Sequence, residues 1–72
     1  KTEFLILEYF MKNKGLSCSR EKIIVGVWGY DFDGEEKIVD VYINSLRKKI
    51  DPKSYYIHTI RGFGYIFQYK ED

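Results

Sequence analysis

One segment of the chain combines a sustained helical repeat with a defined end. Between residues 37 and 50, four apolar residues recur at spacings of four, three and four: Val39, Ile43, Leu46 and Ile50. This spacing places them on one face of an α-helix. Pro52 ends the run, because proline lacks a backbone N–H and clashes with the preceding helical turn. The segment therefore predicts an amphipathic helix over 37–50 whose apolar face is buried.

The residues that follow predict a β-hairpin. Residues 55–60 and 65–69 are rich in β-branched and aromatic side chains, and Arg61-Gly62-Phe63-Gly64 between them has the composition of a turn. Gly62 and Gly64 allow this turn to come close to another backbone.

Two further helices are predicted in the first thirty residues. Thr2 can cap the first, Lys14-Gly15 ends it, and four residues at helical spacing are expected to face the core: Phe4, Leu7, Phe10 and Met11. The second begins after Ser19 as its cap and stops at Gly29. Gly26 inside it costs up to ~1 kcal/mol relative to Ala, which indicates close packing against another element.

The predicted order is helix, helix, helix, hairpin, which is a mainly α fold with a small β-hairpin. A chain of 72 residues has room for one small domain, residues 1–72, and buries only roughly 60% of its unfolded surface. Seven Tyr, five Phe and one Trp must therefore pack tightly.

Cysteine and histidine are too few for a disulfide or a structural zinc site. Cys18 is the single cysteine and His58 the single histidine. We expect no metal or cofactor, and a reducing cytosol as the location.

No stretch approaches the ~20 apolar residues of a membrane span. Because helix-like residues start at once and the first is not Met, we expect a segment upstream of residue 1.

Charge is distributed unevenly along the chain, although the formal net charge is only +1. Residues 1–36 carry five basic and seven acidic side chains, whereas residues 37–70 carry seven basic and two acidic ones. A locally basic half is expected of a surface that binds a polyanion, although a solvated charged surface is the commoner explanation.

The face of the third helix opposite the apolar one has the chemistry of major-groove recognition. At 100° per residue it carries Lys37, Val41, Asn44, Ser45 and Lys48. Asn can bond adenine, Ser can bond several base edges, and Val can touch a thymine methyl group. Lys37, Arg47, Lys48 and Lys49 would neutralise phosphates. An ordinary solvated helix face is the alternative.

Other features have simple explanations. Arg61 at the hairpin turn suits a minor groove, or merely faces solvent. Residues 30–36 form a polar, acidic loop that lacks the alternating ligands of a calcium-binding EF-hand. His58 and the serines have no catalytic partners placed by any motif, so we do not expect an enzyme.

Several short motifs together resemble one known family. They are Thr2-Glu3-Phe4, Ser19-Arg20-Glu21, Val27-Trp28-Gly29, Val39-Asp40-Val41-Tyr42-Ile43, Leu46-Arg47-Lys48-Lys49 and Ile57-His58-Thr59-Ile60-Arg61-Gly62-Phe63-Gly64-Tyr65. Their order and spacing resemble the OmpR/PhoB family of response-regulator effector domains over almost the whole chain. Each motif is weak alone, but together they form a strong signal.

The resemblance implies a winged helix-turn-helix that binds double-stranded DNA. Residues 37–50 would be the recognition helix in the major groove, and the wing around Arg61 and Gly62 would reach the adjacent minor groove. Phosphate or wing contacts are implied for Trp28, Lys37, Tyr42, Arg47, Thr59, Arg61 and Tyr65. Base-facing positions are implied for Val41, Asn44 and Ser45.

The resemblance also implies partners. The loop with Tyr30, Asp31, Asp33, Glu35 and Glu36 would contact RNA polymerase, and its acidity would keep it away from DNA. Binding as tandem copies on direct repeats, in the cytoplasm of a bacterium and in a two-component system, is expected.

The chain departs from the family pattern in two ways. Many members have Arg where this chain has Asn44 or Ser45, so the preferred DNA is expected to be richer in A and T. The family's N-terminal four-stranded sheet and its phosphorylatable receiver domain, the link to a sensor histidine kinase, are not in these 72 residues. We expect the helical side that the sheet would cover, Leu5 included, to favour self-association.

One alternative function remains open. In a protein-interaction winged helix, the acidic loop and the exposed side would bind a partner and the basic helix would only be solvated, without specific DNA binding.

Overall fold

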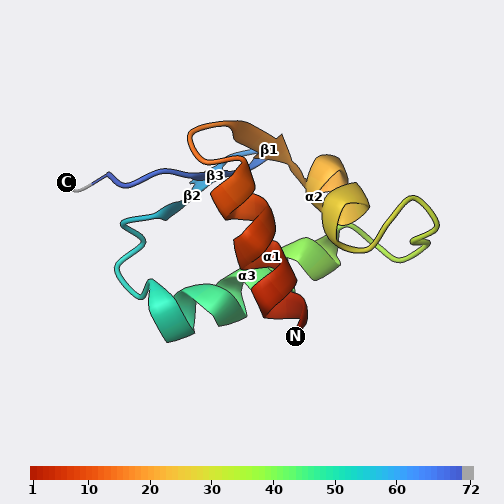
Figure 1. Cartoon of the computed structure of the whole chain (residues 1–72), viewed down its shortest axis with the longest axis horizontal. Helices are drawn as coiled ribbons and strands as arrows, with labels where there is room; N and C mark the ends of the chain where they lie inside the picture. The colour runs from red at the N-terminus through yellow and green to blue at the C-terminus, as the bar shows by residue number, and fades with distance from the viewer. Residues whose placement is uncertain (71–72) are drawn as a thin grey trace.

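The computed structural model describes residues 1–70, and its elements follow one another in the predicted order with one addition (Figure 1). They are α1 (Thr2–Lys12), β1 (Ser17–Ser19), α2 (Arg20–Val27), α3 (Lys37–Ile50), β2 (Ile57–Ile60) and β3 (Gly64–Phe67). The three helices and the C-terminal hairpin are confirmed. The addition is β1, for which the sequence Ser17-Cys18-Ser19 gives no strand signal.

Strand β1 joins the hairpin to make a three-stranded antiparallel sheet in the order β1-β3-β2. Cys18 lies opposite Tyr65, and Ser19 lies opposite Gly64. A Cβ atom at Gly64 would lie 2.1 Å from the carbonyl oxygen of Cys18, so only glycine fits where the two strands meet. The close approach predicted for Gly64 is therefore confirmed, and its partner is the backbone of β1.

The core lies between the helices and this sheet. Its members are fully or nearly buried: Ile6, Phe10, Cys18, Ile23, Ile24, Val39, Ile43, Leu46, Ile57 and Tyr65. Residues from every element contribute, so the hairpin is part of the packed domain.

The predicted buried face of α1 is wrong in part. Phe10 is buried, but Phe4 is 66% exposed and Met11 is 61% exposed, while Ile6 is fully buried. Apolar side chains occur on most sides of this helix, so spacing alone did not determine which side contacts α2 and α3. The predicted Thr2 cap is also wrong, because Lys1 precedes the first turn and no side chain caps it.

Helix α2 begins and packs as predicted. The Ser19 hydroxyl accepts a hydrogen bond from the backbone N–H of Lys22 at 3.1 Å, which is the expected capping contact. A Cβ atom at Gly26 would lie 2.3 Å from a ring carbon of Tyr9 on α1. The glycine therefore allows the two helices to pack closely, as its cost in a helix suggested.

The end of α3 differs from the prediction in one residue. Val39, Ile43 and Leu46 are buried, but Ile50 in the last turn is half exposed. The next residue, Asp51, is 4% exposed and turns the chain toward β2. Its carboxylate accepts from the backbone N–H groups of Tyr55, Tyr56 and Ile57 at 2.9, 3.1 and 2.9 Å. Strand β2 begins at Ile57, two residues later than predicted, and residues 55 and 56 belong to the turn that Asp51 holds.

Candidate nucleic-acid interface

Helix α3 presents a continuous exposed stripe to solvent. Lys37, Val41, Asn44 and Lys48 are all exposed, and Val41 is 65% exposed although it is apolar. Beside the stripe, a hollow of about 390 Å³ lies between Asn44, Lys48 and the turn at Pro52. These four predicted residues are brought together on one accessible face, which we call the α3 stripe.

Ser45 does not belong to the α3 stripe, contrary to the prediction from helical spacing. It is half-buried, and its hydroxyl donates to Oε2 of Glu3 in the first turn of α1. Nζ of Lys49 donates to the other oxygen, Oε1, at 2.8 Å. The hydrogen bonds from Lys49 and Ser45 lower the pKa of Glu3. This side of α3 is therefore turned toward α1. Lys49, which was predicted to contact a phosphate, is already paired with the Glu3 carboxylate.

Arg47 links α3 to the hairpin. Its Nε and Nη2 donate to the carbonyl oxygen of Ile57 at 3.2 and 3.0 Å, and Nη2 also donates to Oγ1 of Thr59 at 2.8 Å. The guanidinium carbon lies 5.4 Å from the centre of the Tyr65 ring. Arg47 thus holds the angle between α3 and β2 while it remains partly exposed.

A second guanidinium packs against the same ring. The guanidinium carbon of Arg20 lies 5.3 Å from the Tyr65 ring centre, and its Nε donates to Oδ1 of Asp40 at 2.9 Å. The Tyr65 hydroxyl donates to the same Asp40 oxygen. These hydrogen bonds join α2, α3 and β3, and the pairing with Asp40 raises the pKa of Arg20.

Tyr65 does not have the surface position that the resemblance implied. It is 3% exposed, with its ring close to Arg20 and Arg47 and its hydroxyl bonded to Asp40. Burial, together with the bond to Asp40, raises its pKa to about 12. Its environment is that of a core residue which supports Arg20 and Arg47.

Trp28 and Tyr42 form an aromatic edge between the end of α2 and the first half of α3. Their ring centres are 5.7 Å apart, and the Trp28 ring also packs against Phe32 at 5.4 Å. Both residues are partly exposed. The predicted contact residues at these positions therefore reach the surface, although they also pack against the core.

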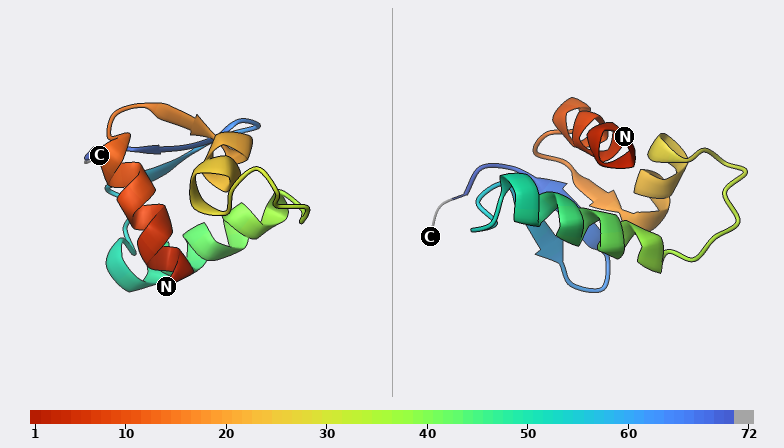
Figure 2. Two further views of the ribbon diagram at one scale, coloured as in Figure 1. Left: turned by 45° about the vertical axis from the view of Figure 1, so that its right-hand side comes forward. Right: turned by 90° about the horizontal axis from the view of Figure 1, so that it is seen from below.

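The hairpin turn is exposed to solvent. Arg61, Gly62 and Phe63 are exposed, and Gly62 has φ +75°, a conformation that L side chains rarely adopt. The right-hand view of Figure 2 places α1 and the hairpin turn on opposite sides of α3. Arg47 of α3 also donates to Thr59, two residues before Arg61, so the hairpin that carries the turn is held against α3, as expected of a wing beside a recognition helix.

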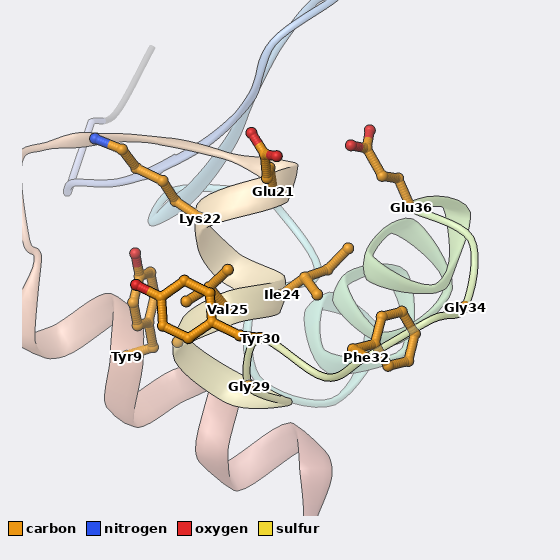
Figure 3. Close-up of a pocket in the computed structure, with 11 residues that line it drawn as sticks. Tyr9, Glu21, Lys22, Ile24, Val25, Gly29, Tyr30, Phe32, Gly34 and Glu36 are labelled. Atoms are coloured by element: carbon orange, nitrogen blue, oxygen red, sulfur yellow. The ribbon is translucent and has the colours of Figure 1, made fainter.

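The acidic loop 30–36 projects beyond α2 and the start of α3, at the right of Figure 1. Tyr30 is 90% exposed, and Asp31, Asp33, Glu35 and Glu36 are all exposed. Between this loop and α2 lies a pocket of about 640 Å³ (Figure 3). Its lining includes the apolar side chains of Ile24, Val25 and Phe32. The loop thus combines negative charge with an adjacent apolar surface.

Residues 1–70 contain no helix that is long and apolar enough to cross a membrane. The same residues contain no group of three or more His, Cys, Asp or Glu side chains that could hold a metal ion.

Three residues that shape this surface were missed in the sequence: Glu3, Asp40 and Asp51. Each contacts a partner on another element, and for Glu3 the partner Ser45 is 42 positions away. Spacing within one helix carries no signal of such contacts. The one local clue is the position of Asp51, directly after the helix and before Pro52.

Comparison with known proteins agrees with this geometry. The family model described as "Transcriptional regulatory protein, C terminal" matches residues 1–67. The transcriptional regulatory protein TrcR of Mycobacterium tuberculosis is 48% identical over 68 residues, which are 93% of this chain and 26% of that protein. The chain therefore spans about a quarter of the length of this curated relative.

Solved structures show the same fold. The DNA-binding domain of Bacillus subtilis CssR has a TM-score of 0.83 and 40% identity, with 93% of this chain and 74% of that one covered. The Klebsiella pneumoniae RstA DNA-binding domain, solved in complex with the RstA box, has a TM-score of 0.81 and 31% identity, with 94% and 70% covered. The winged helix and the resemblance are confirmed: the chain belongs to the family of transcriptional regulatory protein C-terminal domains, the OmpR/PhoB-type effector domains of response regulators.

Proposed function

We propose that this chain binds double-stranded DNA sequence-specifically and thereby regulates transcription. Helix α3 would enter the major groove, and the turn at Arg61 would reach the adjacent minor groove. The observation that carries this proposal is that α3 presents an exposed stripe and that Arg47 ties the same helix to the hairpin whose turn is exposed. The RstA domain, which has the same fold, was solved in complex with its DNA box, and this supports the assignment.

Phosphate contacts would provide the affinity and the register. Lys37, Lys48 and Arg61 are exposed cations at the two ends of the α3 stripe and at the wing. The other proposed contacts, which are partly or fully exposed, are Trp28, Tyr42, Arg47 and Thr59. Cations in this arrangement neutralise the DNA backbone and release counterions, whatever the base sequence.

The acidic loop would serve a protein partner instead of DNA. Four exposed carboxylates repel phosphates but attract a basic protein surface. The pocket beside Phe32 adds an apolar surface of the kind that protein contacts use. We propose RNA polymerase as that partner. A loop variant that still binds DNA but no longer activates transcription would support this proposal.

The longer protein would be a response regulator. The Staphylococcus saprophyticus response regulator ArlR is 46% identical over 68 residues, which are 31% of its length. On this basis we propose a receiver domain controlled by a histidine kinase, a cytoplasmic location, and binding of paired copies to direct repeats.

The exposed apolar side chains of α1, Phe4, Leu5 and Met11, would favour self-association of the 72-residue chain. A monomer at high concentration in size-exclusion chromatography would argue against that last point.

The DNA-binding proposal is tested by selection from random duplexes, followed by fluorescence anisotropy with the selected and scrambled sequences. Specific binding predicts a preferred sequence, together with an affinity that falls steeply as salt rises. A protein-interaction winged helix predicts equal binding of all duplexes, no tighter than roughly 10⁻⁴ to 10⁻⁶ M at physiological salt. The two functions are therefore separated by one titration series.

A further inference from the structure

The carboxylate of Glu3 holds two residues of α3 that lie one turn apart. It accepts from the Ser45 hydroxyl at Oε2 and from Lys49 Nζ at Oε1, 2.8 Å away. A serine hydroxyl has a single proton, so Ser45 has none left to donate to a base. We call this arrangement of Glu3, Ser45 and Lys49 the Glu3 clamp.

The Glu3 clamp and the α3 stripe occupy different sides of the helix. At about 100° per residue, positions 37, 41, 44 and 48 fall within roughly 60° of one another, whereas Lys49 is about 80° away from Val41. Ser45 lies between the two, about 40° from Val41 by the same count. The contact with Glu3 assigns Ser45 to the clamp side, toward α1.

The base-reading part of the α3 stripe thereby reduces to two side chains. Lys37 and Lys48 are long cations at its ends and suit phosphates. Between them, Val41 and Asn44 are exposed, three residues apart. Helix residues with this separation contact neighbouring base pairs in zinc-finger complexes. Val41 and Asn44 can therefore address two adjacent pairs.

We infer that Val41 and Asn44 read the bases while Glu3 keeps Ser45 out of the readout, and that each half-site contains an adenine beside a thymine. Asn44 would bond N6 and N7 of the adenine, and Val41 would contact the thymine methyl group in the major groove. This inference rests on the proposed function, of which it defines the target. Glu3 is a positioning residue here, since it acts through Ser45.

Modified duplexes test the two contacts without altering the fold. In the selected sequence, each adenine in turn is replaced by 7-deazaadenine, which lacks N7, and each thymine by uracil, which lacks the methyl group. One 7-deazaadenine position should weaken binding of the 72-residue chain roughly 5-fold or more. One neighbouring uracil position should weaken it roughly 4-fold.

Variants then assign each effect to a residue. Asn44→Ala should bind the 7-deazaadenine and adenine duplexes equally. Val41→Ala keeps only part of the apolar contact and should reduce the difference between the uracil and thymine duplexes. Ser45→Ala is the matched control, and its selected sequence should be the same as that of the wild type. Glu3→Ala frees the Ser45 hydroxyl and should change the base preference at one further position, an effect that Ser45→Ala in the same chain abolishes.

The outcomes distinguish this inference from the proposed function. A shifted base preference in Ser45→Ala, or the wild-type preference in Asn44→Ala, would overturn the inference while leaving specific DNA binding intact. A wild-type preference in Glu3→Ala would overturn the positioning role of Glu3. Equal binding of every duplex by the wild type would overturn the proposed function itself, and the inference with it.

Discussion

Arg47 on α3 donates two hydrogen bonds to the carbonyl oxygen of Ile57 on β2, from Nε at 3.2 Å and from Nη2 at 3.0 Å. The same Nη2 reaches Thr59 at 2.8 Å. A side chain in the recognition helix therefore determines where the wing lies relative to that helix. Arg47 has a structural role in addition to any contact with a phosphate.

Arg47→Lys should separate these two roles. Lysine keeps the positive charge but lacks the planar fork of donors, so we expect a loss of about 1 kcal/mol in the free energy of unfolding. DNA affinity should fall although the net charge is unchanged, because the wing is less well placed. Urea denaturation and anisotropy measure the two effects. Lys48→Arg, an exchange of one cation for another on the α3 stripe, is the control and should change stability and DNA affinity little. Wild-type stability in Arg47→Lys would contradict the role assigned to Arg47.

Two glycines of the hairpin should respond differently to substitution by alanine. At Gly64, a Cβ atom would lie 2.1 Å from the Cys18 carbonyl oxygen, and the backbone there cannot move without disturbing the β1–β3 pairing. At Gly62, nothing lies within 4 Å, and the strain comes from φ +75° alone. We expect Gly62→Ala to cost about 1 to 2 kcal/mol and Gly64→Ala clearly more, by thermal or urea unfolding. Equal losses would show that β1 does not pack against Gly64 as described.

Removing the Asp51 carboxylate should destabilise the junction between α3 and β2. Asp51→Ala leaves three backbone N–H groups without their acceptor, and we expect a loss of about 3 kcal/mol or more. Asp51→Asn retains one acceptor oxygen of similar shape and should lose less. Hydrogen exchange would localise the effect: the amides of residues 55–57 should lose protection first. Unchanged protection at these amides would count against the capping role.

The raised pKa of Tyr65 predicts a dependence of stability on alkaline pH. Its pKa rises from 10.0 to about 12 on folding, chiefly because of burial and then because of Asp40. Between these values the unfolded chain has released the proton while the folded chain still holds it, so stability falls as the pH rises from about 10 to 12. Below pH 10 the contribution is complete, and it amounts to about 2 to 3 kcal/mol.

Tyr65→Phe serves as the reference for this measurement. Other tyrosines and the lysines titrate in both proteins, so their effect cancels in the difference between the two unfolding free energies. The stability advantage of the wild type over Tyr65→Phe should shrink between pH 10 and 12. A difference that stays constant over this range would mean that the Tyr65 hydroxyl is not buried against Asp40.

Helix α3 and the hairpin could be predicted because their signals are local. The 4-3-4 spacing at Val39, Ile43 and Leu46 defines one face whatever surrounds it. Helix α1 offers apolar side chains on several faces, so contacts with other elements determine that Ile6 is buried and Phe4 is not. Strand β1 is three residues long, Ser-Cys-Ser, and exists through its pairing with β3 about fifty positions later, for which its own composition gives no signal.

The interface could be located from the sequence more readily than its individual roles. Helical spacing placed Val41, Asn44 and Lys48 on the exposed face, and the structure agrees. The same spacing also placed Ser45 there, because the angle between Ser45 and Val41 is small and the contact with Glu3 is invisible in the spacing. The resemblance marked Tyr65 as a contact, but its burial follows from the packing of Arg20 and Arg47 around it.

The central claim, that the α3 stripe and the hairpin turn together form the DNA-binding surface, is tested most directly by NMR titration of the 72-residue chain with its selected duplex. The largest amide shift changes are predicted at positions 37, 41, 44 and 48 and at Arg61 and Gly62, with little change along loop 30–36. Shift changes confined to that loop and to the exposed side of α1, with none in α3, would contradict the claim.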